Sequence, residues 1–272
     1  MKTKNEPMPD GCPPIIDWEK EQFVYKDKTI TLKDIKNHIN EYAIATNAPQ
    51  GSVASWEWHS KRYLMSLKYV AENQLFAGTV YEAGGAGIFT YLLEKIFTFD
   101  TPIVHTTTDL RHPLELSPAS IDSILCMEVF EHINDVHLHH QFRFDGVRRM
   151  LESFWNILKP NGCVFVTTPN ISGALSIYKI IKAKNPMMFP MHVREYTPQE
   201  LKCIFEAVGY EVFICCTEYI FPGYSIDYIH SFLKSAGAPT DNRGDDVVVI
   251  ARKPENATMS ANANLYSVVK SV

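Results

Sequence analysis

Two carboxylates and an imidazole stand close together where Glu128, Glu131 and His132 form an E-x-x-E-H pattern. His132 could act as a general base for a hydroxyl or an amine, because the pKa of an unperturbed histidine lies near neutrality. The three side chains could instead bind a divalent metal ion, with His192 from the later H-V-R-E-Y segment as a fourth ligand. Such a mixed ligand set suits Mg or Mn, and the ion would lower the pKa of a substrate hydroxyl. In a third alternative His132 is only structural and closes its loop by hydrogen bonding.

Three glycines follow an acid in the segment VYEAGGAGIFTYLLEKI, in which Glu82 precedes Gly84, Gly85 and Gly87. An apolar run leads into the glycines and a helical pattern follows them, which is typical of a backbone that approaches a cofactor closely. The dinucleotide pattern G-x-G-x-x-G is incomplete, because Thr90 stands at its third glycine position and the acid precedes the glycines. An NAD(P)-dependent oxidoreductase is therefore a less favoured alternative. The irregular loop also leaves open a catalytically silent nucleotide-binding protein.

Strand and helix patterns alternate from residue 78 onward, and these elements must position the candidate residues. We expect strands in GTVYEA, PIVHTTTDL, SIDSILCMEVF, NGCVFVTTPN, EVFICCTEYI and DDVVVIARK. We expect helices in IFTYLLEKIF, FDGVRRMLESFWNILKP, TPQELKCIFEAVGY and SIDYIHSFLKSAG. This alternation predicts an α/β fold with a doubly wound, mostly parallel sheet. Ligands of such sheets bind outside the carboxyl ends of the strands, where the glycine-rich turn would lie.

The N-terminal part has a different pattern. FVYKDKTITL predicts a small hairpin with its turn at Lys26, Asp27 and Lys28. LKDIKNHINEYAI has the apolar spacing of a helix, and SWEWHSKRYLMSLKYVAENQL predicts a second helix with Ser55 as its N-cap.

An acid at the end of the first strand, followed by glycines, resembles the first motif of the class I S-adenosylmethionine-dependent methyltransferases. Glu82 and Gly84 match the family pattern acid-x-Gly-x-Gly-x-Gly, whereas Ala86 and Ile88 stand where glycine is commoner. Two later segments, SIDSILCMEVFEHI and RRMLESFWNILKPNGCVFVTTPN, resemble the family's fourth strand and the helix, turn and fifth strand that follow it. A third, HVREYTPQELKCIFEAVGYEV, resembles the segment after the fifth strand in the small-molecule and ubiquinone-biosynthesis members. The resemblance covers about residues 55–253. It implies a Rossmann-like methyltransferase sheet of seven strands and S-adenosylmethionine as the cofactor.

The resemblance also implies roles for particular residues. The expected cofactor-binding residues are Glu82, Gly84, Gly85, Gly87, Asp109, Leu110, Glu128 and Tyr63. The expected catalytic residues are His132, Glu131 and His192. The E-x-x-E-H pattern resembles an arrangement in some O-methyltransferases of ubiquinone biosynthesis and in small-RNA 2′-O-methyltransferases. This likeness implies a Mg or Mn site made of Glu128, Glu131, His132 and His192.

Asp109 has three alternative roles. It lies 27 positions beyond Glu82, where the family's ribose-binding acid is expected. The segment TDLRHPLELSPASIDSILC also resembles the family segment in which an aspartate beside the adenine precedes the fourth strand, and Asp109 and Leu110 would then serve the adenine. A solvated turn aspartate is the third alternative, because aspartate is common in turns.

Composition restricts the partners. The net charge is −5 and the basic residues are scattered, so we expect no nucleic acid partner. No apolar run approaches the ~20 residues of a membrane span, and the N-terminal residues lack a signal-peptide core. The six cysteines form no C-x-x-C pair, which predicts reduced thiols in a cytoplasmic protein.

These observations predict a methyltransferase that acts on a small molecule. Transfer to a hydroxyl is the first choice and transfer to an amine the second, and a homodimer is compatible with the sequence. We expect an N-terminal extension or helical cap at 1–54, a methyltransferase domain at 55–253 with a lid insertion at 171–196, and a disordered tail at 254–272.

Overall fold

The strands form two separate sheets, a hairpin and a five-stranded sheet, within the part of the chain that the computed structural model describes, residues 22–136, 144–221 and 226–260. The strands are β1 (Gln22–Tyr25), β2 (Lys28–Thr31), β3 (Val80–Ala83), β4 (Ile121–Met127), β5 (Leu158–Pro169), β6 (Glu211–Glu218) and β7 (Asp246–Arg252). The helices are α1 (Leu32–Thr46), α2 (Gln50–Trp58), α3 (Ser60–Glu72), α4 (Ile88–Ile96), α5 (Asp145–Ile157), α6 (Ala174–Ile181), α7 (Pro198–Val208) and α8 (Ile226–Ser235). A single 3₁₀ turn, Phe130–His132, follows β4.

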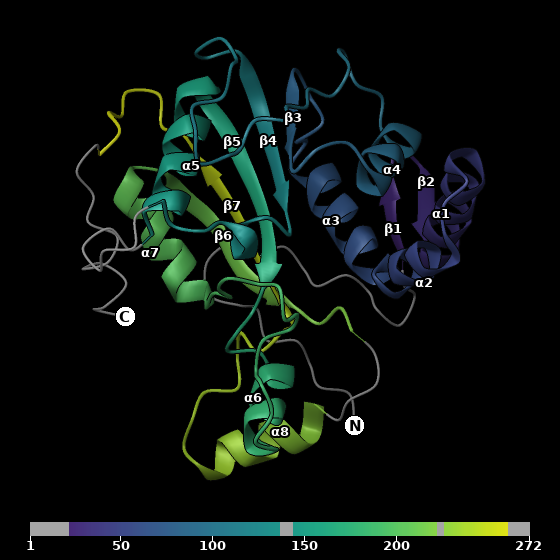
Figure 1. Cartoon of the computed structure of the whole chain (residues 1–272), viewed down its shortest axis with the longest axis vertical. Helices are drawn as coiled ribbons and strands as arrows, with labels where there is room; N and C mark the ends of the chain where they lie inside the picture. The colour runs from purple at the N-terminus through teal and green to yellow at the C-terminus, as the bar shows by residue number, and fades with distance from the viewer. Residues whose placement is uncertain (1–21, 137–143, 222–225, 261–272) are drawn as a thin grey trace.

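The large sheet has the order β3-β4-β5-β7-β6, and helices cover both of its faces (Figure 1). β3, β4 and β5 run parallel, whereas β7 runs antiparallel to both β5 and β6. This arrangement confirms the α/β, Rossmann-like fold class. The seven strands divide into five in this sheet and two in the hairpin. Because β7 is antiparallel, its first residue, Asp246, lies opposite Pro169 at the carboxyl end of β5.

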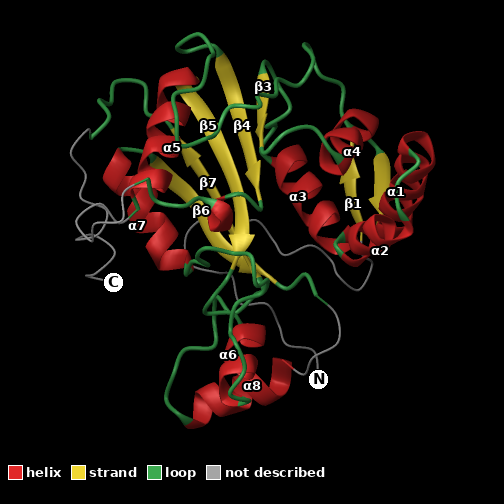
Figure 2. Ribbon diagram, viewed as in Figure 1, coloured by secondary structure: helices red, strands yellow, loops and turns green. Residues whose placement is uncertain are grey.

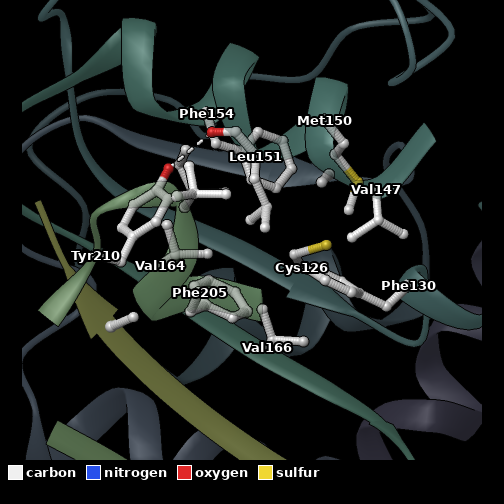
Figure 3. Close-up of a cluster of buried hydrophobic side chains, with 14 of the residues drawn as sticks. Cys126, Phe130, Val147, Met150, Leu151, Phe154, Val164, Val166, Phe205 and Tyr210 are labelled. Carbon is white, nitrogen blue, oxygen red and sulfur yellow. Dashed lines mark hydrogen bonds between the residues drawn. The ribbon is translucent and has the colours of Figure 1, made fainter. Parts of the chain in front are cut away.

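Alternate residues of the central strands enter two different cores. In β7, Val247 and Val249 pack with α5 and α7, whereas Val248 and Ile250 pack with α1, α3 and α4 on the other face. Figure 2 shows the helices that lie on either side of the sheet. Figure 3 shows part of the first core, where the Tyr210 hydroxyl donates a hydrogen bond to the Leu151 carbonyl. A strand buried on both faces reads as a continuous apolar run, as β7 does.

The N-terminal elements confirm the predicted hairpin and first helix. Lys26 and Asp27 both have positive φ, as a two-residue hairpin turn requires. The predicted second helix is instead two helices, α2 and α3, which meet at His59. Ser55 lies inside α2 and is not an N-cap, because α2 already begins after Pro49.

The predicted strand PIVHTTTDL is wrong over most of its length. Val104 alone of this segment pairs with β3, and its amide and carbonyl groups bond to Val80 and Glu82. Pro102 has no amide hydrogen to extend the ladder, and polar threonines follow Val104.

Helices α6 and α8 form an appendage beyond the carboxyl edge of the sheet (Figure 1). They share a small core that includes Ala174, Ile229 and Leu233. Within the described ranges, every helix is too short or too polar to cross a membrane. Residues 1–21 of the expected N-terminal extension and 261–272 of the expected tail lie outside the described residues.

Candidate active site

Two adjoining clefts lie at the carboxyl edge of the parallel strands. The first, here called the glycine cleft, has a volume of about 420 Å³, and its lining includes Tyr63, Glu82, Gly84, Gly85, Gly87 and Glu128. The second, here called the histidine cleft, has a volume of about 670 Å³, and its lining includes His59, Glu131, His192 and Asp246. Arg62, Glu128 and His132 line both clefts. The fold therefore places two ligand-sized spaces on either side of one shared wall.

The glycine turn needs glycine at two of its positions. Gly84 has a φ of +100° and Gly85 a φ of +91°, values that side chains with a Cβ rarely adopt. A Cβ added to Gly84 would also lie 3.1 Å from the Val129 side chain. Gly87 has no positive φ and no atom within 4 Å of an added Cβ. The backbone path thus depends on Gly84 and Gly85, and Gly87 leaves open space beside it.

Thr90, which interrupts the dinucleotide pattern, ties the turn to the first strand. Its hydroxyl accepts a hydrogen bond from the Gly87 amide at 2.9 Å and donates one to Glu82 Oε2 at 2.6 Å. Burial raises the pKa of Glu82 to about 7, although the Thr90 hydrogen bond opposes this rise. Glu82 can therefore take up or release a proton near neutral pH when a charged ligand arrives.

Glu128 forms the wall between the two clefts together with Arg62. Arg62 Nη1 donates to Glu128 Oε2 at 2.8 Å, and the Thr167 hydroxyl donates to Glu128 Oε1 at 2.9 Å. Glu128 itself has a φ of +56°, which turns the chain sharply at the end of β4. Both of its carboxylate oxygens are hydrogen-bonded, and Glu128 is not one of the residues whose possible ligand atoms cluster with the histidines.

Glu131, His132 and His192 come together in the histidine cleft. Glu131 Oε2 accepts a hydrogen bond from the Thr168 hydroxyl at 2.8 Å, whereas Glu131 Oε1 is buried without a hydrogen-bond partner. That oxygen lies 3.9 Å from His132 Nε2 and 4.0 Å from His192 Nε2. One ligand atom from each of the three residues lies within 4.8 Å of the others. Predicted residues that are 60 positions apart in the sequence thus form one cluster.

The electrostatic environment favours the neutral forms of Glu131 and His132. Burial raises the pKa of Glu131 well above its usual range, and the Glu128 carboxylate adds to the rise. Burial and the neighbouring His192 lower the pKa of His132. His192 Nδ1 lies 2.6 Å from Glu195 Oε1, a contact that orients its imidazole and directs Nε2 toward Glu131.

Asp109 and Leu110 lie outside the lining of both clefts. Asp109 is exposed and forms an ion pair with Arg111, whose Nη2 lies 2.6 Å from Asp109 Oδ2. The hydrogen bonds from Arg111 lower the pKa of Asp109 to about 2. Leu110 is buried in the core beside α5. This position of Asp109 fits the alternative of a solvated turn aspartate. The structure brings neither Asp109 nor Leu110 to the glycine cleft.

Sequence reasoning missed two residues of the histidine cleft, His59 and Asp246. His59 joins α2 to α3, where the sequence predicted an unbroken helix. Asp246 begins a strand that was correctly predicted, but only its antiparallel direction brings that residue to the carboxyl edge. The one available signal was a pair of acids, Asp245 and Asp246, before an apolar run.

Comparisons with known proteins agree with this geometry. A family model described as a methyltransferase domain matches residues 44–213. No curated protein sequence matches the chain significantly.

Solved structures with a similar fold include three methyltransferases. One from Archaeoglobus fulgidus, described as S-adenosylmethionine-dependent, is 16% identical with a TM-score of 0.47, and the match covers 75% of this chain and 100% of that chain. One from Aquifex aeolicus with the same description is 12% identical with a TM-score of 0.44, covering 69% and 89%. The phosphoethanolamine N-methyltransferase 2 of Haemonchus contortus, solved with S-adenosyl-L-methionine, is 14% identical with a TM-score of 0.44, covering 79% and 60%.

Proposed function

The chain belongs to the class I S-adenosylmethionine-dependent methyltransferases, and from this premise we propose that it methylates a small molecule, with a hydroxyl as the first-choice acceptor. The observation that carries the proposal is the position of His132, which lines both clefts. Methyl transfer from a sulfonium is an in-line displacement, so the acceptor atom and the methyl group must meet at such a boundary. We assign the glycine cleft to S-adenosylmethionine and the histidine cleft to the acceptor.

The residues of the glycine cleft suit the cofactor. Gly84 and Gly85 let a ligand approach the backbone, and Glu82 can face the positive ammonium of the methionine part. Tyr63 and Glu128 complete the proposed contacts from α3 and from the end of β4. Asp109 and Leu110 were also expected from the sequence to bind the cofactor. Their position outside the cleft favours a ribose contact made by other residues.

A base role for His132 is supported by its lowered pKa, because the neutral imidazole is the form that accepts a proton. Glu131 and His192 would position it or share the proton, since Glu131 Oε1 faces both imidazoles at about 4 Å. The Glu195 contact fixes the ring of His192. A hydroxyl acceptor needs such a base more than a neutral amine does, because a hydroxyl is the weaker nucleophile until its proton leaves.

A divalent metal ion is a second proposal for the same cluster. Glu131 Oε1 is a buried oxygen without a hydrogen-bond partner, and an ion would satisfy it together with His132 Nε2 and His192 Nε2. Mixed carboxylate and imidazole ligands bind Zn more tightly than Mg or Mn, but each of these three ions can bind to such a ligand set. Glu128 would join only by giving up Arg62 or Thr167. When bound, the ion would polarise a substrate hydroxyl.

Transfer to an amine nitrogen is the second candidate activity, favoured by the acidic side chains in the histidine cleft, Glu128, Glu131 and Asp246. We also propose a division of the chain into a cap at 1–54, a methyltransferase domain at 55–253 with a lid at 171–196, and a tail at 254–272. The lid residues Met188 and Phe189 line the histidine cleft, which supports this assignment. A cytoplasmic location is supported by the free thiols of Cys126, Cys163 and Cys203. We also propose that the protein forms a homodimer and that it does not bind nucleic acid.

Titration calorimetry of the chelator-treated protein with S-adenosylhomocysteine, without and with Mg or Mn, tests these assignments. Binding of the nucleoside supports the cofactor assignment and justifies a radiolabelled methyl-transfer screen of hydroxyl and amine acceptors. The Gly84→Val variant should lose this binding. If the metal binds and Glu131→Gln abolishes its binding, the metal-assisted mechanism is supported, and if the metal has no effect, His132 as a base is supported. A protein that binds no S-adenosylhomocysteine would contradict the proposal.

A further inference from the structure

The histidine cleft contains a concentration of polar atoms without partners. Among the described residues, seven buried side-chain polar atoms have no hydrogen-bond partner. Three of the seven belong to residues that line this cleft, namely His59 Nδ1, Glu131 Oε1 and Asp246 Oδ2. Buried polar atoms are nearly always paired, so a cluster of unpaired ones in a cleft points to a ligand that pairs them.

Asp246 is the least explained of the three. Only 1% of its surface is exposed, and its backbone begins β7 between β5 and β6. The preceding residue provides a contrast, because Asp245 Oδ2 accepts hydrogen bonds from the amides of Ile220 at 3.0 Å and Phe221 at 3.1 Å. Asp245 therefore holds the loop after β6 in place. Asp246 lines the cleft and has no comparable structural contact for its Oδ2 atom.

The cations of the cleft do not provide a hydrogen bond for Asp246. Two cationic side chains belong to its lining, Arg62 and Lys179. Arg62 donates to Glu128. The Lys179 ammonium donates to the Met187 carbonyl at 2.8 Å. The Arg62 charge lowers the pKa of Asp246, but burial and the Glu128 carboxylate outweigh it and raise that pKa well above its usual range. A cation that enters with a ligand would stabilise the charged form of Asp246, because a buried carboxylate is costly unless a positive group pairs with it.

Aromatic rings in the same cleft as Asp246 suit the same kind of ligand. Trp58 and Phe221 stack with centroids 6.0 Å apart, and His59 meets Phe221 edge-on at 5.7 Å. All three residues line the histidine cleft. The faces of aromatic rings attract cations, particularly where water is partly excluded. An anionic group in this place would be repelled by the charged form of Asp246.

We propose that the acceptor carries a protonated amine, which Asp246 binds in the histidine cleft against Trp58 and Phe221. This inference rests on the proposed function, because it assigns the acceptor to this cleft. The cations of S-adenosylmethionine do not fill the role, since Asp246 does not line the glycine cleft. A neutral hydroxyl would donate one hydrogen bond but would leave the charge of Asp246 uncompensated.

The test compares acceptor-site probes that share a scaffold and differ in the charge of one end. The full chain is saturated with S-adenosylhomocysteine, and calorimetry then measures the affinity of tyramine, of the neutral 4-ethylphenol and of the anionic 4-hydroxyphenylacetate. An aliphatic series of butylamine, butanol and butyrate repeats the comparison without a ring. The variant is Asp246→Asn, which keeps the shape and removes the charge. The matched control is Asp241→Asn, which removes the charge of an exposed aspartate outside both clefts.

We expect each amine that binds to bind at least roughly 10-fold more tightly than its neutral analogue, with the carboxylate weakest. Asp246→Asn should remove this preference and leave the affinity for 4-ethylphenol unchanged, and Asp241→Asn should keep it. The inference is overturned if neither amine binds, if a neutral or anionic probe binds as tightly, or if Asp246→Asn keeps the preference. Binding of S-adenosylhomocysteine is measured in the unmodified protein and in every variant. A protein that does not bind S-adenosylhomocysteine contradicts the proposed function, whereas a protein that binds it without preferring amines contradicts only this inference.

Discussion

Arg62 on α3 donates a 2.8 Å hydrogen bond to Glu128 at the end of β4, and this ion pair forms the wall that the two clefts share. The side chains are 15% and 17% exposed, so both charges are largely removed from water. Glu128 receives a further hydrogen bond from Thr167, which satisfies its second oxygen. The pair therefore fixes α3 against the sheet at the place where the cofactor and the acceptor would meet.

Removing one member of this pair should destabilise the protein strongly. Arg62→Met leaves Glu128 buried without its cation, and we expect a loss of about 3–5 kcal/mol in the free energy of unfolding together with weaker binding of S-adenosylhomocysteine. Urea denaturation and calorimetry measure the two effects. The matched control is Arg252→Met, because Arg252 forms an ion pair of 2.6 Å with Glu211 in which both side chains are about half exposed. That loss should stay below about 1 kcal/mol. Equal losses in the two variants would contradict a special role for the shared wall.

The loss of stability caused by a substitution in the glycine turn should depend on the backbone conformation of the replaced glycine. Gly84→Ala combines a positive φ with a 3.1 Å contact to Val129, whereas Gly85→Ala has the positive φ alone. We expect Gly84→Ala to cost more than Gly85→Ala, each within about 1–3 kcal/mol, and both to weaken S-adenosylhomocysteine binding. Gly87→Ala is the control, because its conformation and surroundings accept a methyl group. Thermal unfolding and calorimetry would reject this account of the turn if Gly87→Ala were as unstable as Gly84→Ala.

The pH dependence of methyl transfer should reveal a base at His132. Burial and His192 lower the pKa of His132 below its ordinary value of 6.5, so the imidazole is neutral at pH 7. The rate should therefore fall only when the pH decreases below 6.5 and the imidazole takes up a proton. His132→Ala should reduce kcat by roughly 10²- to 10⁴-fold and remove this acid limb. His112→Ala, an exposed histidine outside both clefts, should change neither the rate nor the profile. An unchanged acid limb in His132→Ala would assign the proton to another group.

Most of the fold could be predicted because helix and strand patterns depend on residues that are close together in the chain. The apolar run of β7 and the helical pattern of TPQELKCIFEAVGY, which forms α7, are local features, and the structure confirms both. The segment after α4 was wrongly predicted as a strand because its start is apolar, while Pro102 and the threonines limit pairing to Val104.

The site was harder to predict because its contacts are not local. The sequence indicated Glu131, His132 and His192, but the pairing of Arg62 with Glu128 joins positions 66 residues apart. Asp246 reaches the histidine cleft through the antiparallel direction of one strand, which no residue of that strand encodes by itself. Conversely, Asp109 had the expected spacing, yet a neighbouring arginine holds it at the surface.

Cofactor binding should release protons near neutral pH because of Glu82. Burial raises the pKa of this side chain from 4.5 to about 7 in the folded protein. The unfolded chain releases the proton first as the pH rises, so Glu82 costs no stability below pH 4.5, costs progressively more up to about pH 7, and then has a constant cost of about 3 kcal/mol at most. The ammonium of S-adenosylhomocysteine would favour the charged carboxylate and lower its pKa. Binding near pH 6.5 should therefore release a fraction of a proton, measured by calorimetry in buffers with different ionisation enthalpies.

Glu218 provides the matched control for this prediction. Burial raises the pKa of Glu218 to about 7 as well, but this carboxylate accepts a hydrogen bond from Tyr69 at 2.7 Å and lies outside both clefts. Glu82→Gln and Glu218→Gln should each reduce the loss of stability between pH 4.5 and 7 in the ligand-free protein. Proton release on binding should disappear in Glu82→Gln alone. Release that persists in Glu82→Gln and disappears in Glu218→Gln would show that the cofactor charge does not act on Glu82.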